Sequence, residues 1–217
     1  LKISQDRLLE KEFVNKLGLK TASFCEVSTQ EDLIHAIDQV GTPSILKTRR
    51  FGYDGKGQLK LETASQAENI WKNSSAKDLI LEGFVNFSRE FSVIGSRSKD
   101  GQISCFDPGE NVHKEGILRT TTVPANLTVE QKTEAVLMTA KILESLNYVG
   151  VIGIEFFLEN NSLVINEFAP RVHNSGHWTQ NGCTVDQFEQ HVRAITGWKL
   201  GNAERHSDII MENLIGD

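Results

Sequence analysis

The chain of 217 residues lacks features that mark several common classes of protein. Positive charge is not in excess: the net charge is −6 and the pI is about 5.6, so no basic stripe is available to neutralise nucleic-acid phosphates. No apolar run approaches the roughly 18 residues that a membrane-spanning helix needs, and no signal-peptide pattern occurs near Leu1. We therefore expect neither a nucleic-acid partner nor a membrane partner.

Cysteine is also scarce. Cys25, Cys105 and Cys183 lie far apart and in no metal-ligand spacing. Such cysteines are typical of reduced, packed thiols, so we expect a cytoplasmic protein. Internal repeats and low-complexity segments are absent as well, which leaves an ordinary globular chain with an ample core.

Helix and strand patterns alternate along the chain. Ser4 precedes a helical pattern of Leu9, Phe13 and Leu17, which ends at Gly18. Four later helices are indicated by capping boxes at Ser28/Glu31, Thr63/Gln66, Thr128/Gln131 and Thr184/Gln187. The expected strands are 43–48, 58–61, 78–85, 89–98, 102–107, 149–158 and 162–168. This mixture predicts an α+β fold with mainly antiparallel strands, in which a small unit at about 28–85 precedes a larger one at about 86–217.

A glycine-rich loop follows the strand at 43–48. Lys47 lies near the end of that strand, and the loop holds Gly52, Tyr53, Asp54, Gly55, Lys56, Gly57 and Gln58. Glycine lets backbone N–H groups approach a ligand closely, and the lysines supply positive charge, so the loop can fold over phosphate oxygens. The alternative is a glycine-rich hairpin turn with solvated lysines. The first interpretation predicts a flap that closes over a nucleotide, with residues 49–57 moving as it does so.

Two glutamates interrupt the most apolar strands of the chain. Glu155 lies within 149–158, and Asn166 and Glu167 lie within 162–168. A buried carboxylate needs a cation or a donor, and Mg²⁺ takes one or two carboxylates plus phosphate oxygens. A three-residue turn would put Glu155 and Glu167 on one face, whereas a two-residue turn would put Glu155 opposite Asn166. A structural network with arginine or lysine is the alternative to a metal site.

A polar run from Ala169 to Trp178 follows Glu167 directly. Arg171 can clamp an anion through two parallel hydrogen bonds, and His173 can move a proton near neutral pH. A lone histidine is more often an ordinary surface or core residue. The concentration of polar groups beside two carboxylates nevertheless favours a substrate site here.

Together these motifs resemble the ATP-grasp superfamily, and within it the 5-(carboxyamino)imidazole ribonucleotide synthases of purine biosynthesis. The resemblance covers nearly the whole chain. It rests on 46–49 with 52–58, on 82–85 with 89–93, and on 166–167 with 170–171 and 173–177. It implies an ATP-grasp fold of two α+β subdomains that grip a nucleotide. It also implies an ATP-dependent ligase that carboxylates 5-aminoimidazole ribonucleotide with bicarbonate by way of carboxyphosphate.

The resemblance also implies roles for individual residues. The residues expected to bind ATP are Lys47, the 52–58 loop, the hinge Glu82, Gly83, Phe84 and Val85, and Glu90, His113, Asn166 and Glu167. The expected Mg²⁺ ligands are Glu155, Glu167 and Asn166. The substrate side is expected to hold Tyr53, Arg171, His173 and Asn174, and the residues expected to be catalytic are Arg171, His173 and Lys56.

Both ends of the chain suggest an excised fragment. The chain starts at Leu1 without methionine and ends on an apolar, strand-like run at 209–217. By the resemblance, the family's N-terminal and C-terminal domains are missing, so we expect poor activity from the fragment and a homodimer from the full-length enzyme. Another ATP-grasp carboxylase or ligase, and a non-catalytic nucleotide-binding domain, remain the alternatives.

Overall fold

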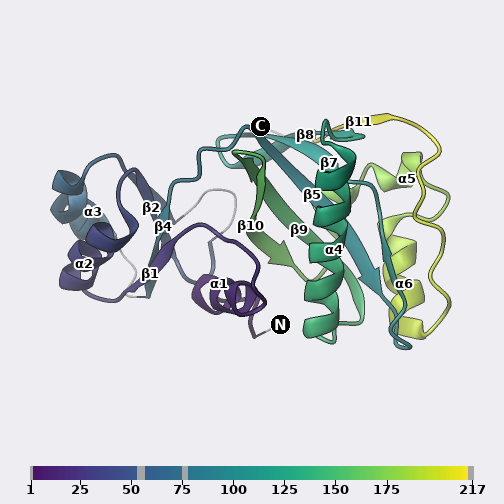
Figure 1. The fold of residues 1–217 in the computed structure, drawn as a ribbon, viewed down its shortest axis with the longest axis horizontal. Coiled ribbons are helices and arrows are strands. Elements are labelled where there is room, and N and C mark those ends of the chain that lie inside the picture. Colours follow the sequence, from purple (N-terminus) through teal and green to yellow (C-terminus); the bar gives the residue numbers. More distant parts are fainter. Residues whose placement is uncertain (1, 53–56, 75–77, 215–217) are drawn as a thin grey trace. The chain divides into compact units, whose positions relative to one another are not determined.

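The computed structural model describes residues 2–52, 57–74 and 78–214, and the chain forms two compact units, Leu1–Asn86 and Phe87–Asp217 (Figure 1). Each unit is built on its own antiparallel sheet with helices packed against it. The predicted α+β class is therefore confirmed. No helix in the described ranges is long and apolar enough to cross a membrane.

The first unit contains a four-stranded sheet in the order β1-β4-β2-β3. Its strands are β1 (Phe24–Val27), β2 (Ser44–Thr48), β3 (Gln58–Leu61) and β4 (Leu79–Gly83). Its helices are α1 (Arg7–Lys16), α2 (Gln30–Val40), α3 (Ala67–Asn73) and the 3₁₀ turn η1 (Ala64–Gln66). Helices α2 and α3 pack on each other and on the sheet, around a core that includes Leu33, Leu46 and Leu81.

The second unit contains a seven-stranded sheet in the order β10-β9-β5-β7-β8-β11, with β6 paired to β5. Its strands are β5 (Arg89–Arg97), β6 (Ile103–Cys105), β7 (Gly109–Lys114), β8 (Ile117–Val123), β9 (Gly150–Glu159), β10 (Ser162–Ala169) and β11 (Ile209–Glu212). Its helices are α4 (Val129–Ser145), α5 (Thr179–Gly182), α6 (Gln187–Thr196) and the 3₁₀ turn η2 (Asn174–Gly176).

Helices α4 and α6 lie against the central strands β5 and β9 (Figure 1). At Gly95 in β5 a side chain would meet Thr139 and Leu143 of α4 at 2.6 and 3.0 Å. The glycine therefore lets α4 approach the sheet closely. Within the sheet, Phe91 of β5 stacks on Phe156 of β9 with ring centroids 5.1 Å apart, and both side chains are fully buried.

The β9–β10 hairpin combines a two-residue turn with a β-bulge. Asn160 and Asn161 adopt φ values of 49° and 65°, and Glu159 pairs directly with Ser162. This left-handed pair is the geometry of a tight hairpin turn, which asparagine tolerates. The register then shifts between Ile165 and Glu167, so that Glu167 lies opposite Glu155. Neither predicted alternative is right by itself: the turn has two residues, yet the bulge restores the pairing of the two carboxylates.

Two of the predicted helix caps are confirmed. The capping boxes Thr63/Gln66 and Thr128/Gln131 form as expected, ahead of η1 and α4. The box before α2 is displaced by one residue, to Thr29 and Asp32. Helix α6 is capped by Asp186, whose carboxylate accepts two N–H groups, rather than by Thr184.

The first helix is shifted and rotated relative to the prediction. Asp6, not Ser4, is its N-cap, and its buried positions include Leu8, Lys11 and Val14. The predicted apolar face, Leu9, Phe13 and Leu17, is only partly buried. The error has a physical cause: the buried stripe contains a lysine, which an apolar periodicity cannot detect.

Candidate active site

Four neighbouring strands of the second unit bring ionisable side chains together. Glu167 lies opposite Glu155, Glu155 lies opposite Ser92, and Glu90 is two residues before Ser92 on the same strand. Because side chains alternate along a strand, these groups share one face of the sheet. His113, from β7, completes the group, with its Nδ1 2.8 Å from Oε2 of Glu90.

Glu155 is the most strongly perturbed carboxyl group of this set. Its side chain is buried, and Oε2 accepts one hydrogen bond of 3.2 Å from Nδ2 of Asn166. Burial, followed by the charges of Glu167 and Glu90, raises the pKa of Glu155 to about 8. A carboxylate in this position is poorly compensated by the protein alone, so a cation is needed to keep it ionised.

His113 responds to the same negative charges. Burial lowers its pKa, but the hydrogen bond and charge of Glu90, with contributions from Glu155 and Glu167, outweigh burial and raise the pKa above its usual value. A positively charged histidine here would offset part of the acidic charge. The face is therefore an acidic patch with one titratable cation at its edge.

His173 lies against β9 in a fixed orientation. A side chain at Gly153 would meet the Cβ of His173 at 2.7 Å, so the glycine makes room for this histidine. Its Nε2 is 3.4 Å from Oε1 of Glu155, and its Nδ1 is 2.8 Å from Oγ of Ser175, which in turn accepts from Ser92 at 2.6 Å. The histidine thus joins a buried chain of hydrogen bonds that ends at the carboxylate.

The protonation of His173 differs from the sequence-based interpretation. Burial and the positive charge of Arg171 lower its pKa to about 4. The ring is therefore neutral near neutral pH, whereas the sequence predicts a histidine that exchanges a proton in this range. Arg171 and Asn174 are exposed, and Nη1 of Arg171 donates to the Val172 carbonyl at 2.9 Å, so both side chains remain accessible to a ligand.

The hairpin residues fit a magnesium ion. No group of three or more His, Cys, Asp and Glu side chains suited to a metal occurs in the described part of the chain. Glu155, Glu167 and the amide of Asn166 offer only two carboxylates and one neutral oxygen. This is the donor set expected where Mg²⁺ completes its shell with phosphate oxygens and water. The raised pKa of Glu155 is the observation that favours a bound cation.

The first unit contains a second buried charged cluster. Lys47, at the end of β2, donates to Oε2 of Glu82 at 2.9 Å, and Nζ of Lys11 lies 3.2 Å from the same oxygen. All three side chains are at least nine-tenths buried. Burial opposes ionisation of Glu82, but Lys11 and Lys47 lower its pKa to about 2. We conclude that Glu82 is an ionised carboxylate held between two lysines.

The other predicted nucleotide-binding residues of this unit are placed as follows. The N–H groups of Gly83 and Phe84 donate to the carbonyls of Ser23 and Pro43, so both are already used within the fold. Gly57 has a φ of 74°, and its carbonyl accepts from the N–H of Thr48 at 3.0 Å. Gln58 pairs with Lys47 across β2 and β3, and Gly52 is half-buried. Tyr53, Asp54, Gly55 and Lys56 lie outside the described residues.

Several residues around these clusters are not predicted by the sequence. Lys11 gives no recognisable motif, because its role depends on a glutamate 71 positions away in sequence that only the fold brings near. No sequence motif marks Ser92 or Ser175 either, although Ser175 lies inside the polar run that follows Glu167. Its position two residues after His173 was the one available hint.

The fold and these two clusters define the class of protein. The ATP-grasp domain family matches residues 12–188, and the chain belongs to that family. The resemblance found in the sequence is thereby confirmed.

Particular relatives narrow the comparison. The chain is 53% identical over 220 residues to an N5-carboxyaminoimidazole ribonucleotide synthase of Brucella melitensis, which covers all of this chain and 61% of the relative. Among solved structures, an N5-carboxyaminoimidazole ribonucleotide synthetase in complex with ADP has a TM-score of 0.94 at 39% identity, covering 98% of this chain and 56% of the other. An Aspergillus clavatus synthase in complex with ADP and 5-aminoimidazole ribonucleotide has a TM-score of 0.92 at 27% identity, covering 100% and 58%. The chain thus spans about 60% of the length of these relatives.

Proposed function

We propose that this chain is the ATP-binding part of an enzyme that carboxylates 5-aminoimidazole ribonucleotide. The reaction consumes ATP and bicarbonate and gives N5-carboxyaminoimidazole ribonucleotide, ADP and phosphate, in purine biosynthesis. The similarity to synthases of this name and to a structure that holds ADP and 5-aminoimidazole ribonucleotide supports the proposal. The cofactors are ATP and Mg²⁺, and bicarbonate is the second small-molecule substrate.

One observation carries the proposal. The bulge in β10 places Glu167 opposite Glu155, and the pKa of Glu155 rises to about 8 because it is buried beside a like charge. A buried carboxyl group whose pKa is raised by burial and by a like charge lowers the stability of the fold once it ionises, so the position of Glu155 favours a functional cation site. Mg²⁺ that accompanies ATP is the cation that best suits two carboxylates and an amide.

The cation cluster of the first unit suits the phosphates of ATP. Lys11, Lys47 and Arg7 all contribute positive charge at Glu82. Lys47 and the glycine loop, with Gly52, Tyr53, Asp54, Gly55, Lys56, Gly57 and Gln58, are proposed to hold the phosphates. The hinge 82–85 is proposed to contact the adenine.

The acidic face of the second unit is proposed to contact the rest of the nucleotide and the metal. Glu90 would accept from the ribose hydroxyls, with His113 beside it, while Glu155, Glu167 and Asn166 hold Mg²⁺. Arg171, His173 and Asn174, with Tyr53, are proposed to line the side of bicarbonate and the ribonucleotide. Arg171, His173 and Lys56 are the proposed catalytic residues.

These residues act mainly by positioning and by charge. ATP would phosphorylate bicarbonate to carboxyphosphate with release of ADP. The exocyclic amine of the ribonucleotide would then attack the activated carbon, the bond from that carbon to the phosphate oxygen would break, and the nitrogen would lose a proton as phosphate leaves. Bound Mg²⁺ supplies neutralisation of the phosphate charge. The exposed guanidinium of Arg171 can clamp anionic carboxyphosphate, and His173, neutral and oriented by Ser175, can donate or accept one hydrogen bond without carrying charge.

An ATPase assay of the full-length protein tests this proposal. ADP release should require bicarbonate, increase at least about tenfold with 5-aminoimidazole ribonucleotide, and be lost in Glu167→Gln. Glu159→Gln, on the same hairpin but at its turn, is the matched control and should retain activity. If another amine or acid stimulated ADP release and 5-aminoimidazole ribonucleotide did not, the protein would be a different ATP-grasp ligase. Metal-independent ATP binding without turnover would identify a non-catalytic nucleotide-binding domain.

Two further expectations belong to this proposal. Cys25, Cys105 and Cys183 form no disulfide, which supports a cytoplasmic location. A homodimer is proposed for the full-length enzyme, and sedimentation velocity at micromolar concentration would distinguish a dimer from a monomer.

A further inference from the structure

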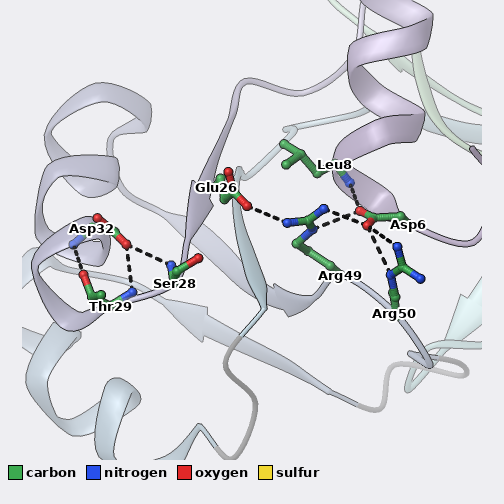
Figure 2. Close-up of polar contacts among 8 residues, drawn as sticks. All are labelled: Asp6, Leu8, Glu26, Ser28, Thr29, Asp32, Arg49 and Arg50. Atoms are coloured by element: carbon green, nitrogen blue, oxygen red, sulfur yellow. Dashed lines mark hydrogen bonds and ion pairs between the residues drawn. The ribbon is translucent and has the colours of Figure 1, made fainter.

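Asp6 organises a buried cluster of charges at the start of α1 (Figure 2). Its side chain is fully buried, and its Oδ1 accepts from Nε of Arg49 at 3.0 Å while Oδ2 accepts from Nη2 of Arg49 at 2.7 Å. Arg50 donates to the same Oδ2 through Nε and Nη2, at 3.2 and 3.1 Å. Oδ1 also caps α1 by accepting from the N–H of Leu8 at 3.1 Å. One carboxylate therefore holds two consecutive arginines and a helix end.

The two arginines occupy a defined place in the chain. They follow β2 directly and begin the connection that carries the glycine loop to β3. The backbone of Arg49 is bonded on both sides: its N–H donates to the Asp78 carbonyl, and its carbonyl accepts from the N–H of Arg7, both at 3.0 Å. Its guanidinium also donates to Glu26 of β1 through Nη1 (Figure 2). Arg49, directly after β2, is thus hydrogen-bonded to α1, to β1 and to the residue before β4.

The charges of the cluster favour a rigid connection. Arg49 donates to both oxygens of Asp6 through a planar fork, an arrangement that fixes orientation as well as distance. Burial raises the pKa of Asp6, but the two arginines and the Leu8 N–H outweigh burial and lower it. Lys47 is the last residue but one of β2, and Arg49 follows the strand directly, so the direction of the Lys47 side chain depends on how the end of β2 is held.

We propose that Asp6 is a positioning residue for nucleotide binding. By holding Arg49 and Arg50 it fixes the end of β2, from which Lys47 projects and the glycine loop departs. Asp6 acts through these residues and does not contact the nucleotide. The expected effect of Asp6 on ATP binding rests on the proposed function, whereas its expected effect on the rigidity of the end of β2 does not.

A substitution pair in the same unit isolates this role. Asp6→Asn keeps an acceptor for the helix cap but removes the charge that holds the arginines. Asp32→Asn is the matched control, because Asp32 is also a capping carboxylate, accepting from the N–H groups of Ser28 and Thr29, yet it contacts no residue of the β2 end (Figure 2). Both substitutions remove one negative charge from the same sheet unit.

Hydrogen exchange tests the positioning without any nucleotide. Asp6→Asn should accelerate exchange of the Arg49 amide by about tenfold or more relative to Leu46 in the middle of β2. Asp32→Asn should leave this ratio unchanged. If Asp6→Asn does not fold, Arg49→Lys, which keeps the charge but loses the planar fork, should give the same local acceleration. Equal acceleration of Arg49 and Leu46 would reveal general destabilisation and overturn the proposal.

Steady-state kinetics of the full-length protein test the link to ATP. Asp6→Asn should raise the KM for ATP by about tenfold, while kcat and the KM for the ribonucleotide stay within about twofold. Asp32→Asn should match the parent protein. An Asp6→Asn variant that is folded and has an unchanged KM for ATP would overturn the inference. A parent protein without ribonucleotide-dependent ATP turnover would instead refute the proposed function, and the exchange experiment would still decide the role of Asp6.

Discussion

Replacing Glu155 by glutamine should stabilise the metal-free protein. Glutamine keeps the size of the side chain and an oxygen that can accept from Asn166, but it removes a carboxyl group that must take up a proton on folding because it is buried beside Glu167. Most substitutions of buried residues destabilise, so an increase in stability is an unusual expectation. It follows from the poor compensation of the carboxylate in the absence of a cation.

The magnitude follows from the pKa of Glu155, which is about 8 in the folded protein against an ordinary value of 4.5. A carboxyl group whose pKa is raised by folding leaves the free energy of unfolding unchanged well below pH 4.5. As the pH rises from 4.5 towards 8, the group lowers that free energy by an increasing amount. At pH 7 the cost is about 3 kcal/mol, and at pH 5 it is below about 1 kcal/mol. Glu155→Gln should recover these amounts.

Urea denaturation of metal-free protein at pH 5 and pH 7 measures this difference. The free energy of unfolding of Glu155→Gln should exceed that of the parent protein at pH 7 and approach it at pH 5. Glu159→Gln should change stability by less than about 0.5 kcal/mol at either pH. Addition of Mg²⁺ and ATP should then stabilise the parent but not the variant. A loss of stability in Glu155→Gln at pH 7 would mean that the carboxylate has a structural partner, which would refute the reasoning.

Three further substitutions probe other parts of the structure. Glu82→Gln should lower the free energy of unfolding by about 3 kcal/mol at pH 7, because the pKa of Glu82 is about 2 in the folded protein against an ordinary value of 4.5. This contribution of Glu82 to stability is complete above pH 4.5 and is lost as the pH falls towards 2. The denaturation curves of the parent and the variant should therefore converge in acid. Gly153→Ala should cost about 1–3 kcal/mol and reduce ATP turnover, since its Cβ would collide with His173; a fully active variant would argue against the observed place of that ring. Asn161→Val should destabilise by about 1–2 kcal/mol in thermal unfolding and Asn161→Gly should not, because φ is 65° there, and equal stability of the two would contradict the tight turn.

Local patterns predicted much of the fold. The capping boxes at Thr63 and Thr128 form as the sequence indicates, because such boxes depend on residues three positions apart. The polar strands β7 and β8 and the short strand β1 are not predicted. Glu110, Asn111 and His113 give β7 little of the apolar alternation that marks a strand, and its pairing with β5 and β8 depends on the whole sheet.

The candidate site was predictable as a set of residue types but not as a geometry. Glu155 and Glu167 stand out as charges within apolar strands, whereas the bulge that places them opposite each other depends on how the two strands pair, which residue types alone do not give. Asp6 and Lys11 could not be found, since their partners Arg49 and Glu82 are distant in sequence. The neutral state of His173 follows from burial, which no motif reports.

Crystals grown with Mn²⁺ and a non-hydrolysable ATP analogue test the central claim most directly. Anomalous scattering should place the metal about 2.1 Å from carboxylate oxygens of both Glu155 and Glu167, with phosphate oxygens completing its shell. A metal bound away from this hairpin, or a nucleotide bound with no metal on either carboxylate, would contradict the account.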